Sequence, residues 1–182
     1  MSKLDLMFQF RDRLEEVSGE CHFLSDEETV NEAILKFLWH EGIGSVVIGK
    51  DSWKQEHRES LQNQAIILAD FSTAGVNRED AIDACARAGA GIFKATALIA
   101  GTGTVVIESH DMGDRLVSTL PPTSIIIADK APVYAMLEEY MQQASRDISF
   151  SFITGPSRTA DIEKKLVLGV HGPIRVVVWV RE

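Results

Sequence analysis

The chain has 182 residues, and its 27 acidic against 18 basic residues leave a formal net charge of −9. With 45% hydrophobic and 25% charged residues, the composition is typical of a folded domain and not of a disordered chain. The length predicts a single domain over residues 1–182. The negative charge disfavours nucleic acid and anionic membrane as partners, because both would repel it, but backbone amides could still bind a small anion locally.

Targeting, membrane and metal signals are weak. The only cysteines are Cys21 and Cys85, far apart, whereas a structural zinc or iron–sulfur site normally needs about four ligands, so no metal site is expected in this chain. No apolar run approaches the ~20 residues that span a bilayer. Residues 1–13 alternate charged and apolar side chains and lack the apolar core of a signal peptide. We therefore expect a cytoplasmic protein with reduced thiols.

Hydrophobic spacing and capping residues predict helices and strands in alternation through the first half. In chain order these are a helix over 3–17, a helix opened by a Ser25–Glu28 capping box and ended by Gly42 and Gly44, a strand over 45–48, a helix from Asp51 or Ser52 to Gln62, and a strand over 65–69.

The second half begins with the same alternation. In chain order we expect a helix over 78–88 capped by Asn77, strands over 94–100, 104–109 and 124–128, a helix after Asp129, a strand over 148–153, a helix over 160–168, and a final strand over 174–180. The fold class is therefore α/β, a mostly parallel sheet flanked by helices. Because the stretch 94–128 breaks the alternation, we expect a hairpin or small secondary sheet there.

The segment 154–162 is the first candidate for a binding site. It lies between an expected strand and an expected helix, so backbone N–H groups and the positive end of the helix dipole would meet there. Gly155 permits unusual backbone angles, Ser157 and Thr159 offer hydroxyl groups, and Arg158 suits a carboxylate or phosphate. Equally, the segment could simply cap the helix, with Arg158 solvated or paired to an acid.

The turn Gly101–Thr104 is the second candidate. Its two glycines and its hydroxyl groups on Thr102 and Thr104 could cradle an anion, or form a plain hairpin turn. It is neither a Walker motif nor a complete dinucleotide-binding fingerprint.

Two further side chains could act at such a site. His171 follows Gly169, which is typical of a helix end, and would either interact with the last helical carbonyls or serve as a titratable base. Arg115, upstream of Ser118 and Pro121–Pro122, could reach an anion or form a surface ion pair.

The run Gly155-Pro156-Ser157-Arg158-Thr159-Ala160-Asp161-Ile162-Glu163, followed by Gly169-Val170-His171-Gly172-Pro173, resembles the signature of LUD-domain proteins. That family, once a family of uncharacterised function, includes the lactate-utilisation protein C type. Thr102–Thr104 and Arg115 fall in the family's order. The resemblance covers residues 65–182, whereas residues 1–64 fit only as generic α/β.

The resemblance implies a fold similar to that of CoA-transferases and ribose-phosphate isomerases. It also implies a role beside iron–sulfur subunits in oxidising L-lactate to pyruvate, with the clusters expected only in the partners. The ligand-binding residues expected by this resemblance and the spacing are Thr102, Gly103, Thr104, Arg115, Gly155, Ser157, Arg158, Thr159, Asp161 and His171, with His171 as the catalytic candidate.

Two positions depart from the family pattern. Gly101 stands where relatives often carry Glu, and Thr96 lies near a position where they often carry Asp. If those acids act in relatives, this chain has lost their chemistry, so the sequence leaves open whether it is an enzyme.

Three hypotheses follow. The first is a non-redox subunit of organic-acid oxidation that binds a small carboxylate; the second is a sensor for a phosphorylated metabolite or nucleotide; the third is an assembly module. On the first, the glycine loops and both arginines converge at the carboxyl edge of the sheet. The chain is also compatible with a homodimer.

Overall fold

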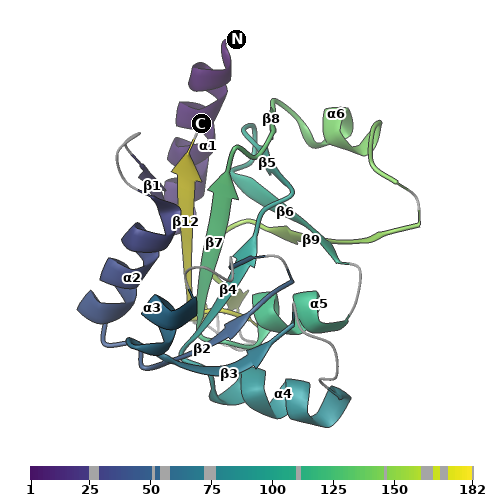
Figure 1. Cartoon of the computed structure of the whole chain (residues 1–182). Coiled ribbons are helices and arrows are strands. Elements are labelled where there is room, and N and C mark those ends of the chain that lie inside the picture. Colours follow the sequence, from purple (N-terminus) through teal and green to yellow (C-terminus); the bar gives the residue numbers. More distant parts are fainter. Residues whose placement is uncertain are drawn as a thin grey trace.

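The computed structural model describes residues 1–24, 29–50, 52–53, 58–71, 77–109, 112–145, 147–160, 166–168 and 172–181 (Figure 1). Its main sheet has six strands, all paired in parallel, in the order β1-β12-β7-β4-β2-β3. Their bounds are β1 Glu20–Phe23, β2 Ser45–Ile48, β3 Ile66–Asp70, β4 Ala90–Lys94, β7 Thr123–Asp129 and β12 Arg175–Arg181. The predicted α/β class is confirmed.

A second sheet of four strands lies beside the first, in the order β8-β5-β6-β9. Its strands are β5 Ala97–Ile99, β6 Thr104–Ser109, β8 Val133–Tyr134 and β9 Ser149–Ile153. β6 pairs antiparallel with both β5 and β9. The small secondary sheet predicted around 94–128 is therefore present, and it also recruits two later strands.

Six helices cover these sheets in the described part of the chain: α1 Lys3–Glu16, α2 Val30–His40, α3 Arg58–Gln62, α4 Arg78–Arg87, α5 Met112–Thr119 and α6 Leu137–Met141. Buried side chains of α2 and α3 pack on one face of the main sheet. Those of α1, α4 and α5 pack on the other face, together with the second sheet, whose outer side carries α6 (Figure 1). None of these described helices has the length and apolar character needed to cross a membrane.

The two central strands show why the main sheet forms. In β7, Ile125 and Ile127 face the α2 side, whereas Ile126 faces the α1 side. In β12, the continuous apolar run 176–178 is fully buried, as predicted for a strand covered on both faces. Burying each such side chain contributes about 1.5–3 kcal/mol, so apolar residues on both faces stabilise a central parallel strand.

Local capping sets the helix starts. Thr29, not Ser25, caps α2: the Thr29 hydroxyl accepts a hydrogen bond from Glu32 N at 3.2 Å, and the Glu32 carboxylate accepts one from Thr29 N at 3.1 Å. The predicted Ser25–Glu28 box lies outside the described residues. Asn77 caps α4 as predicted, its side chain accepting from Asp80 N at 3.0 Å.

Two expectations were wrong in extent, and a third is described only in part. The polar helix through Gln62 is described over Arg58–Gln62, whereas Asp51 and residues 54–57 lie outside the described residues. The strand expected over 94–100 is two strands, β4 and β5, in different sheets. After Asp129 the chain first forms β8, and the helix there is the short α6.

α5 is a helix that the sequence pattern did not reveal. Its eight residues include Gly113, Ser118 and Thr119, which are weak helix formers. Tertiary packing requires the glycine, because a Cβ at position 113 would lie 2.3 Å from Cδ1 of Phe71. α5 interrupts the stretch 94–128, in which only strands were expected.

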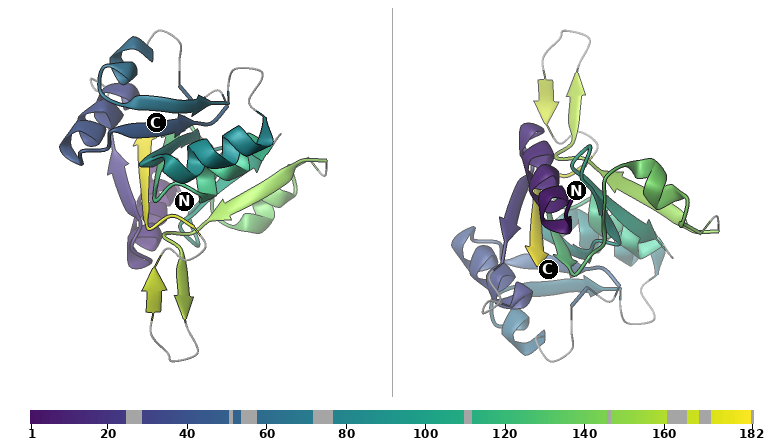
Figure 2. Two further views of the ribbon diagram at one scale, coloured as in Figure 1. Left: turned by 90° about the horizontal axis from the view of Figure 1, so that it is seen from below. Right: turned by 90° about the horizontal axis from the view of Figure 1, so that it is seen from above.

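The helix expected over 160–168 is also wrong. Arg158–Ala160 (β10) and Leu166–Leu168 (β11) instead pair as antiparallel strands. These two strands project from the body of the molecule (Figure 2). The helix dipole expected to begin in this segment is therefore not present at residues 158–160.

Candidate functional site

The two predicted loops do come together. The Thr104 hydroxyl lies 2.7 Å from the Thr102 hydroxyl and 2.7 Å from the Thr154 hydroxyl. This chain of hydroxyl groups joins the turn before β6 to the segment after β9. Long-range pairing of β6 with β9 brings the two segments into register.

Both loops pack against the end of α1. Gly103 and Gly155 have positive φ angles of 64° and 81°. A Cβ at Gly103 would lie 2.4 Å from Leu14 N, and one at Gly155 would lie 2.9 Å from Val17 O. The glycines therefore allow the loops to approach the helix backbone more closely than any side chain would permit.

Arg158 also contacts this helix end. Its Nη2 donates to Val17 O at 2.6 Å and to Ser18 Oγ at 2.5 Å. A cation at a helix C-terminus interacts favourably with the unpaired carbonyls there. This is the capping alternative in a new form, because Arg158 caps a distant helix and not the one expected after it.

These contacts occur at the amino-terminal edge of the main sheet. Ser157 N donates to Pro173 O at 2.8 Å, and Ile174 N donates to Pro122 O at 2.8 Å, just before β12 and β7 begin. The expectation that the loops converge at the carboxyl edge was wrong. The order of the loops along the chain could not predict the edge of the main sheet at which they meet. The segment after β9 follows a strand of the second sheet, not of the main sheet.

The remaining predicted residues are spread more widely. Arg115 is exposed on α5, which packs mainly on α4, β4, β6 and β7. Thr159 lies in β10, and both Asp161 and His171 lie outside the described residues. The ligand-binding roles assigned to all ten residues stay predictions.

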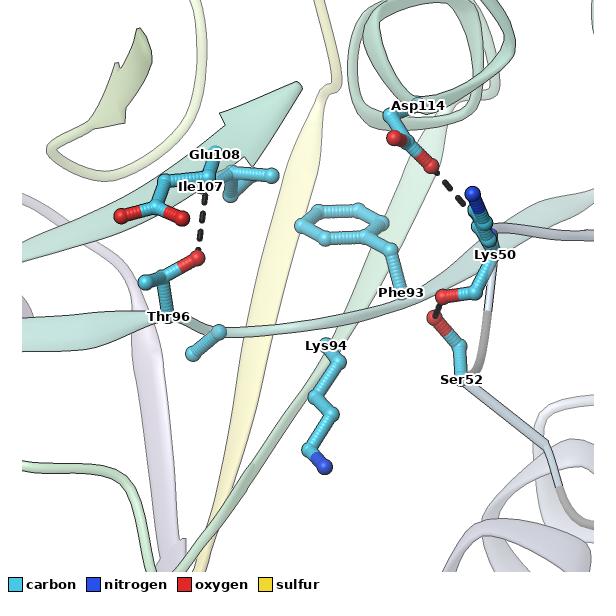
Figure 3. Close-up of a pocket in the computed structure, with 9 residues that line it drawn as sticks. Lys50, Ser52, Phe93, Lys94, Thr96, Ile107, Glu108 and Asp114 are labelled. Carbon is cyan, nitrogen blue, oxygen red and sulfur yellow. Dashed lines mark hydrogen bonds between the residues drawn. The ribbon is translucent and has the colours of Figure 1, made fainter. Parts of the chain in front are cut away.

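The carboxyl edge of the main sheet carries a pocket of about 420 Å³. It opens between the ends of β2 and β4, the second sheet and α5 (Figure 3). Its lining residues are Lys50, Ser52, Phe93, Lys94, Ala95, Thr96, Ile107, Glu108 and Asp114. Crevices at this edge are where open α/β sheets bind ligands.

Four charged residues line this pocket. The exposed side chains of Lys50 and Lys94 follow or end the strands β2 and β4. Asp114 is only 8% exposed, and it accepts a hydrogen bond from Lys50 N at 3.2 Å. Glu108 lies on the opposite side of the Phe93 ring from Asp114 (Figure 3). The lysines can attract a small anion. The Glu108 carboxylate points away from the Phe93 ring, and it accepts a hydrogen bond from Tyr140.

The Glu108 carboxylate contacts Tyr140 of α6. The Tyr140 hydroxyl donates to Glu108 Oε1 at 2.8 Å. Burial raises the pKa of Tyr140, and the hydrogen bond to Glu108 raises it further, so the phenol stays protonated. The backbone N–H of Glu108 donates to Thr96 Oγ1 at 2.9 Å.

The structure shows where the two positions that depart from the family pattern, Thr96 and Gly101, lie. Thr96 lines the pocket, beside Glu108. Gly101 lies outside it, where a Cβ would come within 2.8 Å of Ala135 O, so this backbone leaves no room for an acidic side chain. The acids among the lining residues are Glu108, in β6, and Asp114, in α5, and neither was among the predicted site residues. Lys50, directly after the buried strand β2, and Lys94, the last residue of β4, were the available signal.

A second pocket, of about 340 Å³, lies between β1, β12 and α2. Arg175 dominates it, donating to Glu20 at 2.8 Å and to Glu41 at 2.6 Å. These hydrogen bonds lower the pKa of Glu41 and raise that of Arg175. Because two carboxylates already pair with the Arg175 guanidinium, this pocket is less suited to an anion.

Metal ligation has little support in the described residues, where no group of three or more His, Cys, Asp or Glu side chains could hold an ion. Both cysteines lie buried in the core, and burial raises the pKa of Cys21 to about 12 and of Cys85 to about 11. A cysteine ligates iron or zinc as a thiolate, the form that such burial disfavours.

Residues 7–180 match the family model described as the LUD domain. Among curated proteins, a lactate utilization protein C from Macrococcus caseolyticus is 29% identical over 89% of this chain and 74% of its own length. One from Bacillus pumilus is 27% identical over 97% of this chain and 78% of its own length. One from Bacillus subtilis is 32% identical over 72% of this chain and 60% of its own length.

A crystal structure of a DUF162 family protein from Deinococcus radiodurans has the same fold. It superposes with a TM-score of 0.67 at 19% identity and covers 100% of this chain and 99% of its own.

Proposed function

The chain belongs to the LUD-domain family, and from this premise we propose that it is a non-redox component of lactate utilization that binds a small carboxylate such as lactate. Relatives that share most of its length are named lactate utilization protein C, which supports the proposal. The structural observation that carries it is the pocket at the carboxyl edge, with lysines on its lining and a volume that suits a small metabolite and accompanying water.

The redox centres are assigned to partner proteins. The chain has two cysteines, and both are buried thiols with raised pKa values, so they are poor ligands for an iron–sulfur cluster. We therefore place the clusters in iron–sulfur subunits that would accept electrons from lactate. Two reduced thiols also suit the cytoplasm, where we propose that the protein acts.

Ligand binding is tested by thermal unfolding of the purified protein with L-lactate, pyruvate, a phosphosugar or a nucleotide. A ligand that binds only the folded state raises the melting temperature as RT ln(1 + [L]/Kd). We expect L-lactate to raise it, and the double variant Lys50→Gln/Lys94→Gln to lose the rise. The variant Arg158→Ala serves as the control and should keep it, because Arg158 caps α1 at the other edge.

Other outcomes separate the hypotheses. A rise with the phosphosugar or nucleotide alone would favour the sensor. No rise with any carboxylate would refute carboxylate binding. Loss of the lactate effect in Arg158→Ala, with the lysine variant unaffected, would move the site to the glycine loops.

The cellular role is tested by complementation. Expression of this chain in a Bacillus subtilis strain that lacks its lactate utilization protein C should restore growth on L-lactate as carbon source. Growth that returns with the relative's own gene but not with this chain would contradict the shared role.

A further inference from the structure

β9 is an outer strand of the second sheet (Figure 1). On one side it pairs antiparallel with β6, from Ser149 opposite Ser109 to Ile153 opposite Val105. Among the described residues, no other backbone segment hydrogen-bonds to β9. An outer strand of this kind presents a row of N–H and C=O groups that can pair with a further strand.

This open edge is aromatic on one face. Phe150 packs edge-on against Tyr140, with ring centroids 5.9 Å apart, so it lies on the face of the second sheet that carries α6. Phe152, two positions further along the strand, is on the same face and stacks on Phe150 with centroids 6.2 Å apart. The Phe152 ring is nevertheless 45% exposed. Association at this edge would bury more of that ring, which favours binding.

The two outer strands of the main sheet differ from β9. β1 carries the charged Glu20, and β3 pairs with β2 through a register shift between Val46 and Val47. Charges and bulges on an outer strand oppose its pairing with other strands. The sequence of β9, Ser-Phe-Ser-Phe-Ile, contains no charge and no proline, and its register with β6 is continuous.

A second copy of this chain fits the open edge, because β9 is nearly symmetric about Ser151. A two-fold axis through Ser151, perpendicular to the sheet, would pair two β9 strands antiparallel. Phe150 of each copy would then lie opposite Phe152 of the other, and Ser149 opposite Ile153, with all the phenylalanine rings on one face. Aromatic pairs across antiparallel strands stabilise the pairing.

Charge also favours this edge as the place where two copies meet. Each copy carries a formal net charge of −9, so acidic surfaces repel one another, whereas the five residues of β9 are neutral.

We propose that β9 pairs with β9 of a second copy, which joins the two four-stranded sheets into one continuous sheet. The inference goes beyond the proposed function and does not rest on it, because no residue of β9 lines the pocket at the carboxyl edge. A ladder of five residues is smaller than a standard interface of about 1,600 Å², so we expect a reversible dimer with a dissociation constant in the micromolar range.

Analytical ultracentrifugation over a concentration series measures this association. Wild type should change from monomer to dimer as its concentration rises. Phe152→Lys should weaken the dimer by about tenfold or more, because the substitution enters a two-fold interface twice and removes two aromatic pairs. Ile66→Lys is the matched control, since Ile66 is 68% exposed on the outer strand β3 and the same new charge there should leave the dimer unchanged.

Cysteine substitution tests the register and does not depend on the stability of Phe152→Lys. Ser151→Cys places two thiols directly opposite one another, and mild oxidation should link the copies by a disulfide. Ser149→Cys, on the same face of the same strand, is the control, because its two thiols would lie about 13 Å apart along the strands, beyond the reach of a disulfide. The two native cysteines are buried, so neither should compete.

Several results would overturn the proposal. A wild type that stays monomeric throughout the series would do so, and so would a dimer that Phe152→Lys leaves intact or Ile66→Lys abolishes. A disulfide that forms as readily in Ser149→Cys as in Ser151→Cys would exclude the two-fold axis at Ser151.

Discussion

Gly103 occupies the point where a tight turn meets the backbone of α1. Its φ of 64° is costly for any residue with a Cβ, and the nearest atoms of α1 are backbone atoms, which cannot rotate away as a side chain would. Gly42 has the same φ, 65°, but no atom within 4 Å of its hypothetical Cβ. A comparison of substitutions at the two glycines therefore separates the cost of the left-handed backbone from the cost of close packing.

Gly103→Ala should destabilise the protein much more than Gly42→Ala. Each substitution costs about 1–2 kcal/mol for the left-handed backbone. Gly103→Ala adds about 1–3 kcal/mol of overpacking against α1. Urea unfolding of both variants measures the difference. Equal losses of unfolding free energy would show that α1 can retreat from the turn without cost.

Arg158 illustrates how a residue of the most specific motif can serve the fold. Its guanidinium donates to the last turn of α1, 140 positions away from Ser18 along the chain. A basic residue suited to bind carboxylate or phosphate is equally suited to helix carbonyls. Spacing alone could not distinguish these partners, because α1 reaches the motif only through the tertiary structure.

At the scale of elements, β7 and β12 are joined at their carboxyl ends by a paired ion bridge. Arg181 donates to both oxygens of Asp129, at 2.8 and 2.9 Å, across positions that are directly opposite in the sheet. Arg181 holds the pKa of Asp129 below its usual value, and burial opposes this only in part. The pair is partly solvated, so we expect it to contribute about 0.5–1 kcal/mol.

This contribution depends on pH. Because the folded-state pKa of Asp129 is lowered, the stabilisation is fully present above its unfolded value of about 3.9 and is lost as the pH falls through the folded value. The difference in unfolding free energy between wild type and Asp129→Asn should therefore be largest near neutral pH and shrink towards zero in strong acid. Urea unfolding at several pH values measures it. A difference that stays constant from neutral to acid pH would mean that Arg181 does not act through the Asp129 charge.

At the scale of the whole molecule, the two cysteines report on opening of the core. Cys21 and Cys85 belong to the cluster between the main sheet, α1 and α4, and burial raises their pKa values to about 12 and about 11. Both the low thiolate fraction and the lack of access should slow their reaction.

A thiol-reactive disulfide reagent should therefore label neither cysteine quickly in the native protein and both quickly in urea. The native labelling rate should rise as global stability falls across the variants above. Fast labelling of one thiol in the native protein would reveal local opening at α1 or α4.

Two opposite edges of the main sheet divide the roles. The glycine and threonine loops fasten α1 at the amino-terminal edge, whereas the pocket opens at the carboxyl edge. The described residues of the family signature, Gly155–Ala160, thus lie apart from this pocket.

Local signals in the amino-acid sequence were sufficient to predict the α/β class, the central strands and several helix ends. A continuous apolar run predicts a buried strand such as 176–178, and an Asn before a helical pattern predicts an N-cap such as Asn77. Both signals involve only residues that are neighbours along the chain. The motif around Arg158 likewise identified the family, since it is a property of the residues alone.

The remaining features depend on tertiary contacts that the sequence pattern does not reveal. α5 and the β10–β11 pair were missed because packing overrides weak local preference, as at Gly113. Glu108 meets Tyr140 and Thr96 through strand pairing and helix packing that bridge 32 and 12 positions of chain. Such contacts carry no local periodicity, and the edge of a sheet at which a loop emerges depends on which sheet its strand joins.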